Sequence, residues 1–272
     1  MILFLTGLLL VLMVLVGGER GFHSFLFLIA NAFFGMLGIF LLCYGISPTL
    51  VMAVGCAVFL VVGLPVQNGC NRKSFAAMLA TACILILIGA AIGVVILHVH
   101  ITGLSEIQMR EIDNSYLSSG VNLNLRAILL VSLVWGELGA LMDTSITISS
   151  SMNEVLAAHP DLTEQELRRT GLQIGGTIIG TTVNTLVFIA FGETVLLCML
   201  YRSNGYSPVM LLNSKSFFQQ FGGILFSCLS CLLVIPLTAA IFARITGSAK
   251  AAAWMEKRRT RGERRSNSDS DT

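Results

Sequence analysis

The stretch Trp135–Glu154, WGELGALMDTSITISSSMNE, ends an apolar run that begins after Arg126. A run of this length predicts a membrane-spanning helix, because about 20 apolar residues cross the hydrocarbon core of a bilayer. This span also contains two acids, Glu137 and Asp143. A carboxylate at that depth costs about 2.5–3.5 kcal/mol on insertion scales. We therefore expect the helix to hold its acids for a purpose beyond crossing the membrane.

The composition of the whole chain supports a membrane location. The 272 residues are 55% hydrophobic and only 12% charged, whereas soluble domains carry about 25% charged residues. Apolar runs of helical length recur along the sequence, separated by short polar segments. The sequence thus predicts an all-α fold, a polytopic bundle of transmembrane helices in contact with lipid.

Seven apolar helices are expected, over residues 2–17, 22–44, 50–66, 75–98, 127–151, 172–201 and 218–245. The first is short, so only six helices cross the membrane if it does not span. Pro160 ends the fifth helix region. Thr163 and Glu166 then match a capping box, which starts the next helix. We expect a transmembrane domain over 1–247 and a basic, disordered cytoplasmic tail over 248–272.

The positive charges predict which side of the membrane each loop occupies. With seven spans, thirteen of the 17 Lys and Arg fall on the side of the C-terminal tail. Lys and Arg are enriched in cytoplasmic loops. The tail is therefore expected in the cytoplasm and the N-terminus outside. The basic residues of the C-terminal tail favour contact with anionic lipid over nucleic acid.

A small, acidic and hydroxylated face follows the fifth expected helix, because its members recur at spacings of three and four. The sixth expected helix offers a similar strip, and the short connection favours the two helices as neighbours. Four glycines are expected to let the helices approach closely. The face on the fifth helix comprises Gly136, Gly139, Ala140, Asp143, Thr147, Ser150 and Glu154, and the strip on the sixth comprises Gly176, Thr177, Gly180, Thr181, Asn184 and Thr185.

Two main interpretations of this seam remain open, beside a third in which it contacts lipid or a partner protein. In the first, a protonated Asp143 donates to Thr181 or Asn184 and holds the two helices together. In the second, Asp143 binds a proton or cation and the hydroxyl groups supply oxygen ligands. The candidate binding or coupling residues are Asp143, Glu137, Thr147, Ser150, Thr181, Asn184 and Thr177.

Enzymatic chemistry is not expected. His98 and His100 are two residues apart and do not share a helix face, which argues against a metal site. The sequence has no Gly-x-Ser-x-Gly nucleophile elbow. Glu137 and Asp143 lie on different faces of one helix, which does not suit a carboxyl pair. We therefore expect no catalytic residue, metal or cofactor.

Several motifs together resemble the YibE/F family of bacterial multi-pass membrane proteins. The resemblance covers about residues 17–245, and the motif on the sixth helix is the most specific. The motifs are Gly136-x-x-Gly139-Ala140-x-x-Asp143, Ile174-Gly175-x-x-Ile178-Ile179-Gly180-Thr181-x-x-Asn184-Thr185-Leu186, Asn68-Gly69-x-Asn71-Arg72-Lys73-Ser74 and Ile235-Pro236-Leu237-Thr238.

The resemblance implies a bacterial cytoplasmic membrane protein of the shorter, YibF-like type, from a family without an established activity. Some members are encoded as pairs, so a second membrane protein of the same family is an expected partner. An Arg-Asp pair of the family is replaced here by Gly176 and Thr177, and Glu137 is a candidate for the missing acid. We expect a proton- or ion-coupled transporter or permease component. The alternative is a scaffold subunit that transports nothing.

Overall fold

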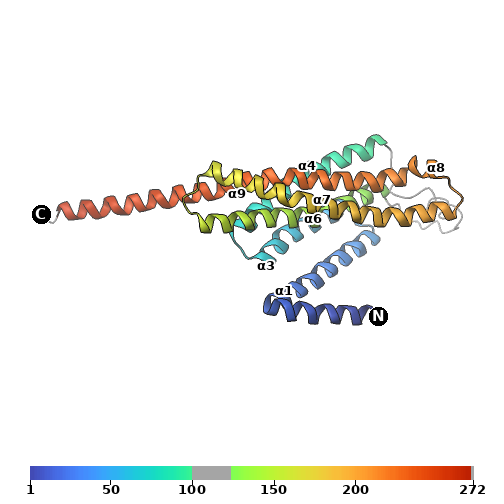
Figure 1. The fold of residues 1–272 in the computed structure, drawn as a ribbon, viewed down its shortest axis with the longest axis horizontal. Coiled ribbons are helices and arrows are strands. Elements are labelled where there is room, and N and C mark those ends of the chain that lie inside the picture. Colours follow the sequence, from blue (N-terminus) through green and yellow to red (C-terminus); the bar gives the residue numbers. More distant parts are fainter. Residues whose placement is uncertain (100–123, 271–272) are drawn as a thin grey trace.

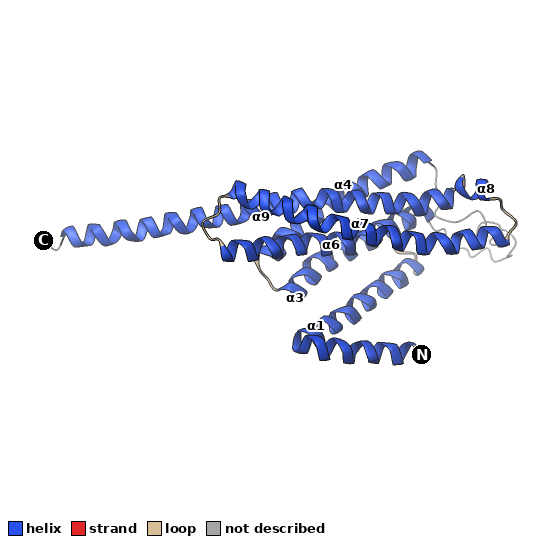
Figure 2. Cartoon of the chain, in the orientation of Figure 1, coloured by secondary structure: helices blue, strands red, loops and turns tan. Residues whose placement is uncertain are grey.

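Helices make up the fold of the protein. A computed structural model describes residues 1–99 and 124–270, and these residues contain no strand (Figure 2). The predicted all-α fold is therefore confirmed. The elements are α1 (Ile2–Cys43), α2 (Pro48–Val58), a π-helical turn η1 (Phe59–Gly63), α3 (Leu64–Asn68), α4 (Arg72–Val99), α6 (Leu125–Ala158), α7 (Glu164–Ser203), α8 (Pro208–Leu212) and α9 (Lys215–Ser270).

Six segments of the described residues are long and apolar enough to cross a membrane, and Leu3–Glu19 forms a shorter apolar helix. The six segments are Gly21–Cys43, Pro48–Asn68, Arg72–Val99, Leu125–Ala158, Glu164–Ser203 and Lys215–Gly247. Each coincides with a predicted helix, because length and hydropathy are local properties of the sequence.

The start of α7 follows the predicted capping box. The Thr163 hydroxyl accepts from the Glu166 amide at 3.3 Å, and the Glu166 carboxylate accepts from the Thr163 amide at 2.9 Å. Two amides that the helix leaves unpaired are thereby satisfied. This cap lets α7 begin eight residues earlier than the apolar run alone predicts.

The turn between α6 and α7, the turn between α3 and α4, and the C-terminal extension of α9 lie toward one end of the bundle (Figure 1). We call it the basic end, because its described positive residues include Arg72, Lys73, Arg168 and Arg169. The N-terminus lies toward the opposite end (Figure 1). The loops predicted to share a side are therefore together in the structure.

α1 folds back on itself at Gly18. This residue has φ 56° and ψ −136°, a conformation open to glycine and strained for other residues. The segment Leu3–Glu19 consequently makes a V with Gly21–Cys43, and its point lies toward the basic end (Figure 1).

The π-helical turn η1 has a cause in the sequence. Pro65 follows it, and proline has no backbone N–H and clashes with the carbonyl four residues earlier. That carbonyl belongs to Val61, inside η1. A wider turn relieves the clash while the segment Pro48–Asn68 stays helical.

The core of the bundle lies between α4, α6 and α9. α4 contributes Ala76, Ala77 and Ala80, which are completely buried. Small side chains let the neighbouring backbones approach closely. Thr81 on α4 and Ser145 on α6 share a hydrogen bond of 2.8 Å in this core. α7 packs chiefly against α9, outside the three-helix core.

The predicted close packing at Gly136, Gly139, Gly176 and Gly180 is wrong within this chain. A Cβ atom added at any of the four would have no other atom within 4 Å. The close approach occurs instead at Gly171 and Gly175 of α7, which share one face. Gly171 meets Met152 of α6 and Ala239 of α9, and Gly175 meets Ile235 of α9. Gly176 lies one residue further around the helix, so it points away from α9.

α9 continues as a helix to Ser270, past the apolar segment that ends at Gly247. Residues 248–270 were expected to be a disordered tail, and the described backbone there is helical. In Figure 1 this part of α9 extends beyond the rest of the bundle. The division of the chain into a membrane domain and a tail at residue 247 stays a prediction.

The two adjacent glycines of α7 give a matched test of this packing. We expect Gly175→Ala to lower the free energy of unfolding by about 1–3 kcal/mol, because its new methyl group collides with Ile235. Gly176→Ala meets open space and should leave stability equal or raise it by up to about 1 kcal/mol through helix propensity. Thermal unfolding of the purified protein in detergent, followed by circular dichroism, measures both. Equal melting temperatures for the two variants would contradict the described face of α7.

Candidate functional site

Two of the acids on α6, Glu137 and Asp143, lie in different surroundings. Glu137 is 1% exposed and points into the core, whereas Asp143 is exposed. They are six positions apart, which is a rotation of about 240° along the helix, or about 120° by the shorter way round. The expectation that they do not share a face therefore agrees with their positions.

Glu137 is held by α9. Ser230 Oγ lies 2.8 Å from Glu137 Oε2 and also 2.8 Å from the carbonyl oxygen of Phe226. A serine hydroxyl has one proton and donates to one acceptor at a time. Both contacts hold together when a protonated Glu137 donates to Ser230 Oγ and Ser230 donates to Phe226. The geometry thus favours a neutral carboxyl group, which is also the cheaper form to bury.

Other hydroxyl groups continue this contact along α6. The Thr144 hydroxyl lies 2.8 Å from the Ala140 carbonyl and 3.8 Å from Cys231 Sγ of α9. Thr144, Ser145 and Ser230 are each at most 2% exposed. Sequence reasoning did not identify Ser230 as the partner of Glu137. Its one signal was a serine in the middle of an apolar run.

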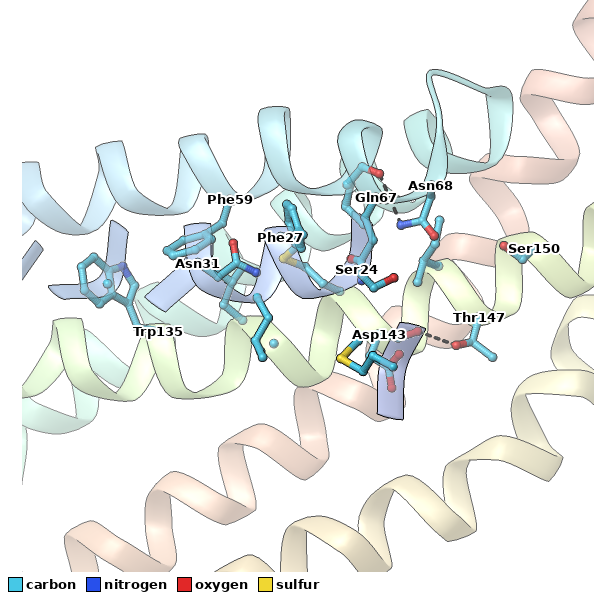
Figure 3. A pocket seen from close by; sticks show the side chains of 18 of the residues that line it. Ser24, Phe27, Asn31, Phe59, Gln67, Asn68, Trp135, Asp143, Thr147 and Ser150 are labelled. Atoms are coloured by element: carbon cyan, nitrogen blue, oxygen red, sulfur yellow. Dashed lines mark hydrogen bonds between the residues drawn. The ribbon is translucent and has the colours of Figure 1, made fainter. Parts of the chain in front are cut away.

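Asp143 faces a cavity of about 1050 Å³ between α1, α3 and α6 (Figure 3). Its described lining contains amide and hydroxyl groups in addition to the Asp143 carboxylate. These come from Ser24 and Asn31 of α1, Gln67 and Asn68 of α3, and Thr147, Ser150 and Ser151 of α6. Thr147 donates to the Asp143 carbonyl at 2.7 Å, so this hydroxyl is tied to the helix backbone.

The cavity follows α6 for much of the thickness of a membrane. Its lining extends from Trp135 to Ser151, about 24 Å at 1.5 Å per residue. Figure 3 shows Trp135 and Phe59 at one end of the cavity and Asp143, Thr147 and Ser150 toward the other. The second end is the basic end of the bundle, because α6 runs toward its turn with α7 (Figure 1).

Trp135 lies at the end of the cavity that is farther from the basic end. The indole ring packs so tightly on Gly38 of α1 and Gly55 of α2 that neither position has room for a Cβ atom. Phe59 meets the same ring edge-on, with the two ring centroids 6.5 Å apart. Trp135 thereby fills the space between α1, α2 and α6 beyond the cavity.

The expected partner strip on α7 is not part of this site. Thr177, Thr181 and Asn184 are exposed and do not line the cavity. The hydroxyls of Thr177 and Thr181 donate to carbonyl oxygens of α7 itself, at 3.3 and 2.8 Å. The expected seam between the fifth and sixth helices is thus wrong, because α7 turns Gly175 toward α9 and this strip outward. Whether any of these side chains binds a ligand stays a prediction.

A further acid, Glu193 of α7, forms a hydrogen bond with α9. The Gln220 amide donates to the Glu193 carboxylate, and both residues lie away from the Asp143 cavity. Glu193 is exposed, as its place near the end of the apolar run predicts. It offers a comparison acid on the same protein for tests of Asp143.

Substitutions at Glu137 and Ser230 test whether the buried acid is neutral. Glu137→Gln should change the free energy of unfolding by less than about 1 kcal/mol, because an amide still forms a hydrogen bond with Ser230. Ser230→Ala should cost about 1–3 kcal/mol, since it leaves the carboxyl group buried without its partner. Adding Glu137→Leu to Ser230→Ala should recover part of that loss. Thermal unfolding checks all three variants, and a loss in Glu137→Gln as large as in Ser230→Ala would contradict the neutral acid.

Comparison with known proteins places the chain in a family. A family model described as YibE/F-like protein matches residues 5–248, which is most of the chain. Neither curated proteins nor solved structures gave a match. The matched region includes the six long apolar helices and both Glu137 and Asp143. The chain is therefore an integral membrane protein that belongs to the YibE/F-like family.

Proposed function

We propose that this protein is a transporter or permease component that takes up its solute in the Asp143 cavity. The observation that carries the proposal is a carboxylate in a cavity of about 1050 Å³ that is lined by polar groups and extends along α6. An acid at membrane depth is expensive unless it faces protein or water. Asp143 faces the polar groups of the cavity, whereas on a lipid-facing surface it would face neither protein nor water.

Under this proposal we assign the opening of the cavity to the end nearer Asp143. Trp135 blocks the end that lies deep in the bundle, and Asp143 lies nearer to the basic end. Positive residues mark the cytoplasmic side of membrane proteins. We therefore assign the basic end, and with it the C-terminus, to the cytoplasm of a bacterial cell. The described conformation then corresponds to a cavity that faces inward.

Proton or ion coupling is assigned to Asp143 and not to Glu137. Glu137 is sealed between α6 and α9, where a bound solute in the cavity does not reach it. Asp143 is exposed to the same cavity as the solute. Competition between a proton and a cation for one carboxylate is a direct way to couple their movements.

Proton flux into proteoliposomes tests this function. Vesicles that contain a pH-sensitive dye are given an inside-negative potential with potassium and valinomycin. We expect the wild-type protein to acidify the vesicles faster than protein-free vesicles do. Asp143→Asn should reduce the rate to that of protein-free vesicles, because an amide side chain does not ionise. Glu193→Gln, which removes an acid outside the cavity, is the control and should keep the wild-type rate. Equal rates for wild type and Asp143→Asn would rule out a proton pathway through Asp143.

A second candidate function is a scaffold subunit that binds another membrane protein of the family. The supporting observation is the exposed strip of α7, where Thr177, Thr181 and Asn184 surround two glycines with open space. Small residues and polar groups on a membrane helix favour contact with another helix over contact with lipid. Within the described residues, no element of this chain covers the strip.

Matched leucine substitutions on α7 test this alternative. Gly176→Leu places a large side chain on the strip, and Gly192→Leu places one on nearly the opposite side of the helix. Both positions have open space, so both variants should fold with the stability of the wild type. If the strip binds a partner, Gly176→Leu should release a protein that copurifies from native membranes in mild detergent, and Gly192→Leu should retain it. Copurification that is equal in both variants would reject this surface.

A further inference from the structure

We infer that the Asp143 cavity binds a monovalent organic cation with an apolar body. This inference rests on the proposed function, because it names the class of solute for the same cavity. It depends on three properties of the described lining: its charge, its aromatic and sulfur groups, and its size.

The charge of the lining favours a cation. Asp143 is the only acid among the described lining residues, and these residues include no Lys, Arg or His. An anionic solute would therefore meet one negative charge and no positive one. The hydroxyl and amide groups of Ser24, Asn31 and Thr147 leave a cation with oxygen acceptors beside the carboxylate. One carboxylate balances one positive charge.

The deeper part of the cavity favours an organic group over a hydrated ion. Trp135 and Phe59 line it, while Phe27 and the sulfur-containing side chains of Met13 and Met142 line the cavity nearer to Asp143. Aromatic faces attract cations within about 6 Å of the ring centroid, and tryptophan attracts them most strongly. Methionine adapts to apolar groups of different shape. A cation that carries alkyl or aryl groups would use both the Asp143 end and the Trp135 end.

The size of the cavity argues against a bare metal ion. A volume of about 1050 Å³ is at the upper end of the range for small-molecule sites, about 300–1,000 Å³. Magnesium and calcium sites need a compact shell of six or more oxygen ligands, usually with several carboxylates. The described residues contain no group of three His, Cys, Asp or Glu side chains that could hold a metal ion.

Two probes of the same shape and opposite charge test the inference. Tetraphenylphosphonium is an aryl cation, and tetraphenylborate is the anion of similar size. We expect the purified full-length protein to bind radiolabelled tetraphenylphosphonium saturably in equilibrium dialysis and to show no saturable binding of tetraphenylborate. Asp143→Asn should weaken the binding of the cation by about tenfold or more, since one charge pair is lost. Glu193→Gln should bind it as the wild type does.

Tryptophan fluorescence locates the bound probe. The sequence has two tryptophans, Trp135 and Trp254. In a Trp254→Phe background the emission comes from Trp135 alone, at the closed end of the cavity. Tetraphenylphosphonium should change this emission with the same saturation curve as in dialysis, and the change should require Asp143. Melting temperatures of all variants establish that each one folds.

The outcomes separate this inference from the proposed function. Absence of saturable cation binding, or equal binding by wild type and Asp143→Asn, would overturn the inference. If Asp143-dependent proton flux is nevertheless present, transport stands and the organic cation is excluded. Asp143-dependent binding of the cation without any Asp143-dependent flux would confirm the site and reject transport.

Discussion

The contact between Glu137 and Ser230 sets the rotation of α6, and the arrangement of the cavity follows from that rotation. A buried carboxyl group without a partner would be costly, so Glu137 must face the hydroxyl of α9. With Glu137 turned inward, Asp143 is carried about 240° around the helix, toward α1. Thr144 and Ser145, which contact α9 and α4, reinforce the same setting. This hydrogen bond acts together with buried apolar residues of α6 such as Leu141 and Ile148, and that buried face determines which acid is sealed and which one meets the cavity.

The helices themselves were predictable from the sequence, because each apolar run contains its own evidence. The six long segments and the capping box at Thr163 agree with the structure to within several residues. The break at Pro160 is also as expected. Even the wider turn before Pro65 has a local cause, although sequence reasoning did not identify it.

The neighbours of each helix were not predictable in the same way. A small and polar face indicates that a helix has a surface suited to contact, but it does not name the helix that occupies it. The pairing of α6 and α7 was inferred from their short connection, yet α7 packs mostly on α9. Gly175 and Gly176 show that a shift of one residue changes the neighbour of a helix face, since Gly175 meets Ile235 and Gly176 meets open space. The cavity-lining residues of α1 and α3 could not be predicted from the sequence either. Their place beside α6 depends on contacts between distant parts of the sequence.

The fold-back of α1 at Gly18 makes one wall of the cavity depend on a single achiral residue. Leu9 and Met13 belong to that wall, and they precede the turn. A side chain at position 18 would favour a straight continuation of the helix, which would swing this arm away from α6. The cavity would then be left as an open trough along the bundle, exposed to the fatty acyl chains. The enclosed shape of this cavity thus depends on the first arm of the chain reversing its direction without a loop.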